Sequence, residues 1–373
     1  MDKKKILIWG WFGHTNVGDD LLLNAIITQI CKSTDCKLTI PMYEKYDYLD
    51  TSILQIDYDI HMLLKPSVID CHDVLIIGPG GLFPIDDTRY LLYIYRIVKV
   101  WKKKSRKVIF WGIGISEAIG IPSIILWNRI VSKTNLFLTR NQKFFPKIHF
   151  RENEDKHSIP DVVFGSMIFK KNVICNRRVI VSVANLDNNN KESKAYLDSI
   201  EIWKTVVSYI LSLGYGVDLI AFTKGSDDIL IEDIANFFND QNIRLIKYKD
   251  AKGTIYSWNE YSFAICMRFH AFVLSILAHV PSLAIAYGQK TVNLAEKCNL
   301  NDYLIKWNPY KKEYFGNEED VESDDIISKI ELLLANIQQV RDKMIRASEK
   351  EISEAKQAYL KLEKILDENN EIM

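Results

Sequence analysis

The stretch ILIWGWFGHTNVGDD, residues 6–20, gives the first indication of how this chain folds. Its four opening residues are apolar, as in a strand that is buried on both faces. Residues 10–18 are rich in glycine, which predicts a loop, and a helix is expected from Asp19 because carboxylates are favourable in a helix's first turn. A strand, a loop and a helix in this order begin an α/β pattern.

The same alternation continues through the first half of the chain. Apolar runs predict strands at 74–77, 108–111 and 136–138, and residues 90–103 have a helical pattern. Continuous apolar strands that are separated by helices predict a mainly parallel sheet with both faces covered.

The second half restarts this pattern. It has strand-like runs at 179–183, 217–222, 263–266 and 282–286, and helix-like runs at 193–213 and 271–278. The length of 373 residues suits two ordinary domains. We therefore predict an α/β fold with two Rossmann-like domains facing a cleft, at 1–170 and 177–322, with the boundary near 168–176. A long C-terminal helical tail is expected at 323–373.

The tail has a helical pattern from Ser323 to about Asp367. Its first part begins with acidic residues and places its apolar residues on one face, as in an amphipathic helix. Residues 349–369 are mostly charged, so this part is expected to face solvent. We expect a structural role for the tail, for example bracing the first domain.

Composition excludes some classes of protein. Lys+Arg and Asp+Glu both number 48, so the formal net charge is zero, which argues against a nucleic-acid partner. The six cysteines form no CxxC pair and no zinc-site spacing, so no metal is expected. With no recognisable signal peptide and no apolar run of about 18 residues, a cytoplasmic protein is expected.

Two segments suggest a peripheral contact with the inner face of a membrane, through residues 100–131. Residues 100–107 are a basic run beside Trp101, and residues 121–131 contain several apolar side chains and Trp127. Basic residues near exposed aromatic side chains suit an anionic membrane surface. The alternative interpretation is a solvated helix end followed by a core helix.

The loop at 10–18 is the first candidate site, because ligands of parallel α/β sheets bind beyond the carboxyl ends of the strands. Gly13 and Gly18 permit a tight loop with exposed backbone N–H groups. Asn16 and Asp19 would grip sugar hydroxyls, with Asp19 as a base, or would simply cap the helix. The glycine order is not GxGxxG, so a dinucleotide site is not supported.

Two weaker signals lie elsewhere in the first half. Gly80 and Gly81 follow the strand at 74–77, where a glycine-rich strand end lets the backbone approach a ligand closely. Arg140 follows the strand at 136–138 and is expected either to reach the cleft or to pair with a surface carboxylate.

The most informative segment is CMRFHA, residues 266–271, at a strand-to-helix junction. Arg268 offers a planar fork of donors that suits a carboxylate or phosphate, and His270 can exchange protons near neutral pH. The N-terminus of the following helix also favours an anion. The strand at 282–286 ends shortly before Lys290, so the sequence predicts an anion site.

These segments together resemble the polysaccharide pyruvyl transferase family. The similar segments are the loop at 10–20, GPGG at 78–81, LTR at 138–140 with IPD at 159–161, and MRFHA at 267–271 with VP at 280–281 and YGQK at 287–290. The sequence departs from the family at Phe269, where Leu is common, and at Gly288 and Gln289, where Asp-Pro is common. Pro79 stands where Gly is common.

The resemblance implies a fold like that of the two-domain glycosyltransferases of the B type. It implies phosphoenolpyruvate as the donor, with no further cofactor, and a glycan, often lipid-linked, as the acceptor. Arg268 and His270 carry over as donor-site residues with Lys290 beside them, and Tyr287 and Arg140 join this group. The product of such a reaction is a cyclic pyruvate ketal across two sugar hydroxyls.

A mechanism follows as a hypothesis. Arg268 and Lys290 would hold the donor's anionic groups, His270 would be the general acid, and Asp19 would deprotonate the acceptor. Domain 1–170 would then be the acceptor side and domain 177–322 the donor side, with a cell-surface or capsular polysaccharide precursor as substrate. The alternatives are a glycosyltransferase that uses a nucleotide-sugar donor and a non-catalytic, glycan-binding relative.

Overall fold

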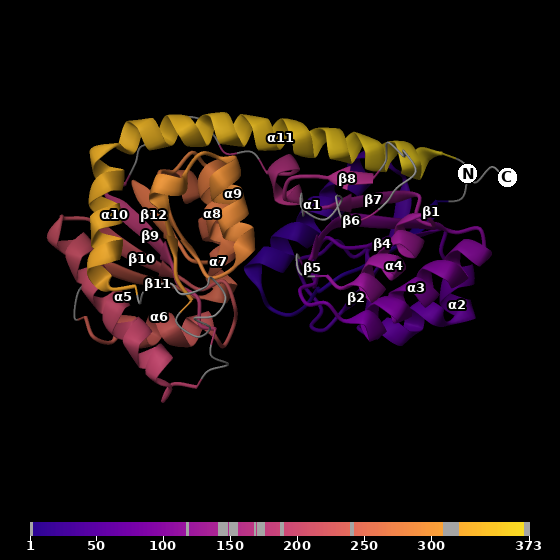
Figure 1. The fold of residues 1–373 in the computed structure, drawn as a ribbon, viewed down its shortest axis with the longest axis horizontal. Coiled ribbons are helices and arrows are strands. Elements are labelled where there is room, and N and C mark those ends of the chain that lie inside the picture. Colours follow the sequence, from indigo (N-terminus) through magenta and orange to yellow (C-terminus); the bar gives the residue numbers. More distant parts are fainter. Residues whose placement is uncertain are drawn as a thin grey trace. The chain divides into compact units, whose positions relative to one another are not determined.

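The computed structural model describes residues 3–116, 119–140, 148, 156–167, 169, 176–186, 190–238, 242–308 and 321–368. The chain divides into two compact units (Figure 1). Unit 1 comprises Met1–Thr15, Asp19–Ser166 and Glu351–Met373, and unit 2 comprises Asn16–Gly18 and Met167–Lys350. The boundary predicted at 168–176 falls almost wholly outside the described residues. That the two domains face a common cleft stays a prediction.

Unit 1 contains a parallel sheet. Its strands are β1 (Lys4–Trp9), β2 (Cys36–Met42), β3 (Leu54–Asp57), β4 (Val74–Ile77), β5 (Gly80–Phe83), β6 (Lys107–Ile115), β7 (Leu136–Thr139) and β8 (Lys156–Ser158). The strand order is β3-β2-β1-β4-β6-β7-β8, and β5 pairs with β6. Every pairing is parallel, which confirms the predicted sheet type.

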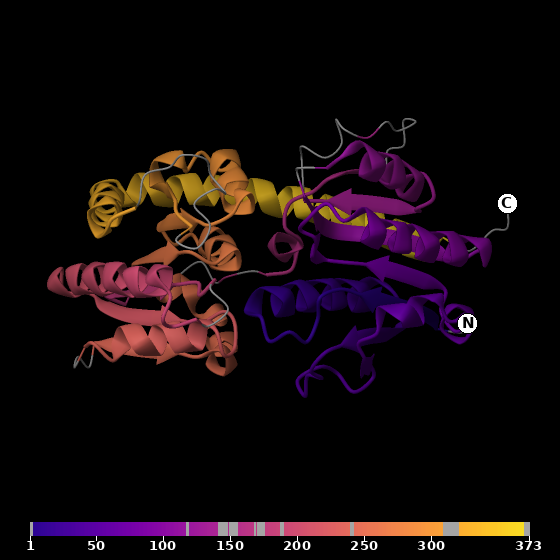
Figure 2. The ribbon, with the colours of Figure 1, turned by 60° about the horizontal axis from the view of Figure 1, so that its bottom comes forward.

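Helices cover both faces of this sheet (Figure 2). They are α1 (Val17–Ser33), α2 (Pro66–Asp70), α3 (Thr88–Lys103) and α4 (Ile121–Val131), with the 3-10 helices η1 (Ile60–Leu64) and η3 (Val162–Gly165). Successive strand residues point to opposite faces. Leu7 and Trp9 accordingly belong to the core under α2, α3 and α4, whereas Ile6 and Ile8 are buried on the other side.

Unit 2 repeats the architecture. Its strands are β9 (Arg178–Ser182), β10 (Gly216–Ile220), β11 (Ile243–Ile246), β12 (Phe263–Cys266), β13 (Ser282–Ala286) and β14 (Leu304–Lys306). Its helices are α5 (Lys194–Ser212), α6 (Asp227–Ala235), α7 (Ala251–Tyr256), α8 (Phe269–Leu277) and α9 (Gln289–Lys297), with the 3-10 helices η4 (Tyr248–Asp250), η5 (Trp258–Glu260) and η6 (Asn301–Tyr303). The sheet order is β11-β10-β9-β12-β13-β14, again all parallel.

Both sheets have the strand order of a Rossmann fold. In each unit the first three strands run outward to one edge and the fourth is placed on the other side of the first. The order therefore reverses between β1 and β4 in unit 1 and between β9 and β12 in unit 2. Ligands of such sheets bind beyond the carboxyl ends of the strands at this reversal point.

The C-terminal tail forms two helices, α10 (Ser323–Ala335) and α11 (Ile337–Asp367). The prediction that residues 349–369 face solvent is wrong for the described part. Ala355, Tyr359 and Leu362 are buried, and the Tyr359 hydroxyl donates to the backbone oxygen of Val162 at 3.1 Å. Small and apolar side chains recur every three or four residues among the charges and give the helix a buried stripe.

Gly80 and Gly81 follow β4, and they begin the short strand β5, which pairs with β6. The membrane interpretation needs correction. The tryptophans on which the membrane interpretation depended are not exposed. Trp101 is fully buried and its Nε1 donates to the backbone oxygen of Leu63 at 2.8 Å, and Trp127 is buried in the same core. Of the helices that the structure describes, none is both long and apolar enough to cross a membrane.

Candidate functional site

The centre of unit 2 is an ion pair at the reversal point of its sheet. Arg268 follows β12 directly and precedes α8. Its Nε lies 2.8 Å from one carboxylate oxygen of Asp227, and its Nη2 donates to the other. Burial would lower the pKa of Arg268, but the Asp227 carboxylate outweighs burial and raises it. The guanidinium is therefore charged and fixed in orientation.

Asp227 is completely buried, and its charge is matched by several donors. Besides the guanidinium, it accepts the backbone N–H groups of Asn185, Phe222 and Thr223, each at 3.1 Å. These groups follow β9 and β10, so one carboxylate connects the ends of three adjacent strands. A buried carboxylate is tolerated when it is paired and hydrogen-bonded in this way. Asp227 was not predicted from the sequence, although it starts a helix after a strand.

A tyrosine and a lysine follow the next strand, β13. Burial alone would raise the pKa of Tyr287, but the charges of Lys290 and Arg268 outweigh it and lower the pKa below its ordinary value. The Lys290 ammonium lies 5.2 Å from the ring centroid of Phe269 and 5.9 Å from that of Tyr287. Lys290 is exposed and forms no ion pair with any described carboxylate. It is thus the cation best placed to meet an incoming anion.

His270 is the second residue of α8, and a segment from the N-terminal loop lies against it. A Cβ atom at Gly18 would be only 2.2 Å from Nδ1 of His270, so only glycine fits there without movement. Asn16 fixes this segment, because its amide donates to the Thr223 hydroxyl at 3.0 Å and the Val17 N–H donates to the Phe222 oxygen at 2.8 Å. Unit 2 therefore brings Asn16 and Gly18 together with Arg268 and His270, although the sequence had suggested that the first two belong to the acceptor side in domain 1–170.

The remaining predicted residues belong to unit 1. Asp19 is in the first turn of α1, and its Oδ1 would lie 3.9 Å from a Cβ atom at Gly80. Arg140 is less available than expected, because its Nη1 lies 2.5 Å from the buried carboxylate of Asp161. This outcome corresponds to the carboxylate pairing that was the alternative for Arg140, although Asp161 is buried rather than on the surface. The other end of the guanidinium would be 3.3 Å from a Cβ atom at Gly114.

The family model that matches this chain is that of the polysaccharide pyruvyl transferases. The match runs over residues 16–289, most of the chain, and includes the Arg268 and His270 segment. The chain belongs to this family. The match ends one residue before Lys290. No protein of curated function is significantly similar to the chain in sequence.

Solved structures confirm the predicted fold of this pyruvyl transferase family member. MnaA of S. aureus, solved with UDP, is 10% identical with a TM-score of 0.57, covering 93% of this chain and 94% of that one. The UDP-GlcNAc 2-epimerase of Methanocaldococcus jannaschii is 13% identical with a TM-score of 0.52, covering 89% and 92%. The glycosyltransferase SnogD from Streptomyces nogalater is 10% identical with a TM-score of 0.53, covering 98% and 100%. At these identities the likeness shows a fold of the glycosyltransferase-B type and nothing more.

An aromatic cluster that was not predicted from the sequence lies at the strand ends of unit 1 in this family member. Its members are Trp11, His14, Tyr43 and Tyr58, which follow β1, β2 and β3. Trp11 stacks on His14 at 4.1 Å and Tyr43 on Tyr58 at 4.1 Å between ring centroids. Trp11 and Tyr43 are each about half exposed, at 47% and 48%. The signal in the sequence that could have indicated this cluster is the presence of aromatic residues directly after neighbouring strands.

Gly13 holds this aromatic cluster in shape. It has φ +81°, and a Cβ atom there would lie 2.6 Å from the backbone N and O of Glu44. The Tyr43 N–H donates to the Phe12 oxygen and the Glu44 N–H to the Gly13 oxygen, both at 3.1 Å. The loops after β1 and β2 are therefore joined through their backbones. The predicted role of Gly13 in a tight loop has a physical basis here.

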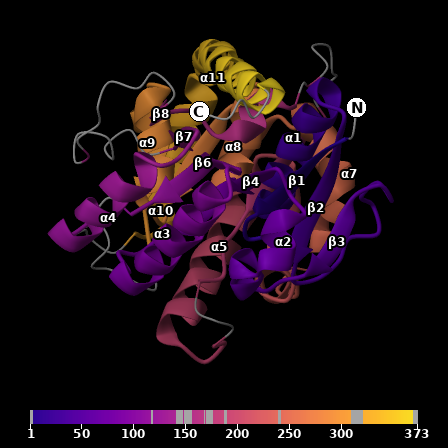
Figure 3. The ribbon, with the colours of Figure 1, turned by 90° about the vertical axis from the view of Figure 1, so that its right-hand side faces the viewer.

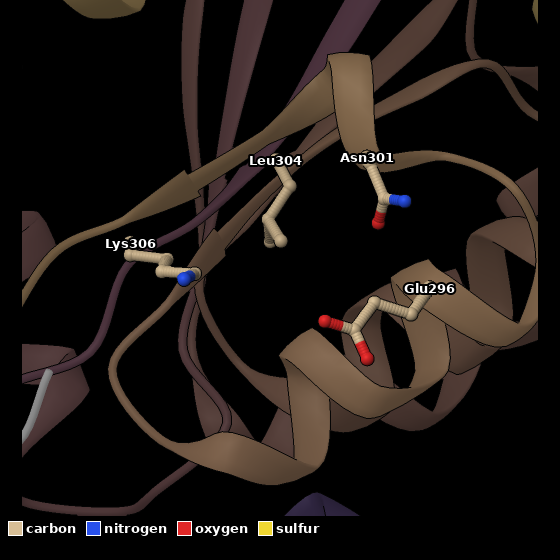
Figure 4. Close-up of a pocket in the computed structure, with 4 residues that line it drawn as sticks. All are labelled: Glu296, Asn301, Leu304 and Lys306. Atoms are coloured by element: carbon tan, nitrogen blue, oxygen red, sulfur yellow. The ribbon is translucent and has the colours of Figure 1, made fainter.

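An open pocket of about 440 Å³ lies elsewhere in unit 2 (Figure 4). It is lined by Glu296, Asn301, Leu304 and Lys306, whose side chains approach a common space. Glu296 is near the C-terminal end of α9, whereas Lys290 is at the N-terminal end of the same helix. The pocket is thus separate from the Arg268 and His270 group.

Proposed function

We propose that this family member transfers a pyruvyl group from phosphoenolpyruvate to two hydroxyls of a sugar in a cell-surface polysaccharide precursor, in the cytoplasm. The product would be a cyclic pyruvate ketal and inorganic phosphate. Membership of the family supports the reaction class. The observation that carries the donor assignment is the group of Arg268, Tyr287 and Lys290 at the ends of β12 and β13.

The charges in this group suit a small dianion or trianion. Asp227 neutralises much of the Arg268 charge and holds its guanidinium in place, while Lys290 is exposed and pairs with no described carboxylate. The helices α8 and α9 both begin here, and their first N–H groups favour anions. A donor with one carboxylate and one phosphate would find a fixed guanidinium, an ammonium and two helix N-termini.

The chemistry would proceed in two additions. His270 protonates the methylene carbon of phosphoenolpyruvate, and the first sugar oxygen forms a bond to C2 as its proton passes to a base. The C2–O bond to phosphate then breaks, and phosphate leaves with the bonding electrons. The second sugar hydroxyl then adds to C2 and closes the ketal, and its proton returns to His270, which the first step left deprotonated. Asp19 is the proposed base, since its carboxylate lies in the first turn of α1 beside Gly80.

The aromatic cluster of unit 1 supports a sugar as the acceptor. The faces of aromatic rings carry partial negative charge, and the C–H groups on one side of a pyranose carry partial positive charge. Trp11 and Tyr43 offer such faces at the carboxyl edge of the sheet, next to a loop that leads to Asp19. We propose that the acceptor sugar stacks there.

Ligand-dependent thermal stability tests the donor. A ligand that binds only the folded state raises its melting temperature. We expect phosphoenolpyruvate to raise the melting temperature and UDP-glucose and UDP-GlcNAc to leave it unchanged. Lys290→Met should reduce the shift with phosphoenolpyruvate, whereas Lys194→Met, at an exposed lysine that starts α5, should not. A shift with the UDP-sugars alone would make the protein a nucleotide-sugar enzyme and overturn the proposal.

A further inference from the structure

One segment of unit 1 has a charge balance unlike that of the rest of the chain. From Thr88 to Lys133 the only acidic residue is Glu117, whereas the basic residues are Arg89, Arg96, Lys99, Lys102, Lys103, Lys104, Arg106, Lys107, Arg129 and Lys133. The whole chain has equal numbers of acidic and basic residues. Of these ten basic residues, five lie within α3 and one within α4.

These two helices lie side by side on the same face of the sheet (Figure 3). Their N-terminal ends are joined, because the hydroxyls of Thr88 and Ser123 are 3.0 Å apart and the Gly120 N–H donates to Asp86 at 2.7 Å. The inner sides of both helices are buried in the core, for example at Ile94 and Trp127. Their outer sides therefore form one continuous surface, which we call the α3–α4 face.

Aliphatic side chains are exposed at the N-terminal end of this face. Ile121 is 73% exposed, Ile85 is 71%, Ile125 is 50% and Leu92 is 49%. Ile85 and Ile121 each adjoin the Asp86–Gly120 hydrogen bond, so they are close in space. Large aliphatic side chains that are exposed together on a soluble surface mark a contact site.

Basic side chains occupy the remainder of the face. The exposed ones are Arg89, Arg96, Lys99, Lys103, Arg129 and Lys133. The four on α3 follow one another at spacings of three, four or seven residues, which keeps them on one side of the helix. None of the six forms an ion pair with a described residue.

The other charged side chains in and next to this segment are paired, buried or hydrogen-bonded to the backbone. Arg106 and Lys104 pair with Asp73 and Asp70, and Lys107 is buried. At the aliphatic end, Asp87 accepts the backbone N–H groups of Arg89 and Tyr90 as the cap of α3, and Asp86 is bound to the Gly120 N–H. The face thus combines a cluster of aliphatic side chains with six cations that pair with none of the described carboxylates.

We propose that the α3–α4 face docks on an anionic lipid membrane. Aliphatic side chains beside exposed Arg and Lys side chains suit the boundary between acyl chains and acidic headgroups. A nucleic acid would match the charge, but it offers no place for four aliphatic side chains and is usually met by stacked aromatic ones. The proposal is independent of the pyruvyl transfer proposed above and uses different residues from Trp101 and Trp127.

Vesicle sedimentation at low and moderate salt tests the proposal. We expect binding to vesicles of phosphatidylglycerol and phosphatidylcholine, little binding to pure phosphatidylcholine, and a decrease with salt. Arg96→Gln with Arg129→Gln should weaken partitioning roughly 30-fold, at about five-fold for each charge. Ile121→Ser with Ile125→Ser should weaken it at every salt concentration. Both pairs are exposed, so folding should be preserved, which circular dichroism would check.

A matched control removes the same charge elsewhere in unit 1. Lys32→Gln with Lys37→Gln changes two exposed lysines outside the α3–α4 face and should bind vesicles almost as well as the unchanged protein. Equal losses in the control and the Arg96/Arg129 variant would mean that only net charge matters, and the proposal would fail. Binding to heparin without binding to anionic vesicles would overturn it as well, in favour of a polyanion site.

Discussion

Asp227 determines the state in which Arg268 meets a ligand. A free arginine side chain must lose rotamer freedom when it binds an anion, whereas here two carboxylate contacts already hold it. The same carboxylate neutralises part of the guanidinium charge. The site therefore divides two tasks, since Arg268 supplies fixed donors and Lys290 supplies unneutralised charge. Residues that follow three different strands are needed to build this arrangement.

Removing the charge of Asp227 should destabilise unit 2. Asp227→Asn leaves Arg268, whose side chain is only 14% exposed, without a counter-charge, which costs up to about 3–5 kcal/mol in the free energy of unfolding. The double variant Asp227→Asn with Arg268→Met should recover part of this loss, because no unpaired charge then remains. Urea unfolding measures both. Asp228→Asn, at a partly exposed neighbour, is the control, and an equal loss there would show that the ion pair is not special.

Some of these residues could be identified as candidate site residues from the sequence, and others could not. Arg268, His270 and Lys290 could be found because each follows a recognisable strand, and ligand sites lie at strand ends. Asp227 could not be assigned as a partner, because it is 41 residues away and the pairing depends on which strands are neighbours in the sheet. The contact of Gly18 with His270 is likewise a property of the fold and not of either local pattern.

At the scale of elements, most buried strands were predicted, with β2 as an exception, and the short edge strands were not. The strands β4, β9, β12 and β13 are mostly apolar and, apart from Arg178 at the start of β9, buried, so their runs stand out. The strands β3 and β11 are at sheet edges and partly exposed, and their sequences LQID and IRLI contain polar residues. An edge strand is specified by its neighbour as much as by its own residues, which a single sequence does not reveal.

Helix α11 provides a matched test of the correction to the tail. Leu362 is fully buried, whereas Leu360, two residues earlier, is 63% exposed. Leu362→Ala should lower the free energy of unfolding by about 2–5 kcal/mol through lost burial and a residual cavity. Leu360→Ala should change it by less than about 0.5 kcal/mol. Urea unfolding compares the two, and equally small effects would restore the solvated interpretation of residues 349–369.

At the scale of the whole molecule, the sheets of the two units have the same strand order, but the units differ in which segments of the chain they contain. Unit 1 takes its last segment from Glu351–Met373, so residues 185 or more positions beyond Ser166 complete it. Lys107, in β6, donates to the backbone oxygens of Ile365 and Glu368 at the end of α11, at 2.6 and 2.5 Å. Hydrophobic periodicity can identify a helix or strand, but it does not show that the C-terminal segment of the chain packs back into unit 1.

The stability of the molecule should also depend on pH, through histidines that unit 1 keeps neutral. Burial lowers the pKa of His72, whose ring nitrogens lie 2.7 Å from the Val68 oxygen and 3.0 Å from the Thr39 hydroxyl, and burial lowers that of His14 as well. Above the ordinary histidine pKa of about 6.5, both the folded and unfolded states are neutral there and nothing is lost. As the pH falls below that value, the unfolded chain takes up protons first, so the folded state loses stability until the lowered pKa is reached.

Thermal unfolding at pH 7.5 and 5.5 should show this loss, and His72→Gln should reduce it. Exposed His61→Gln is the control, and a loss on acidification that is the same in all three proteins would exclude His72 as a source.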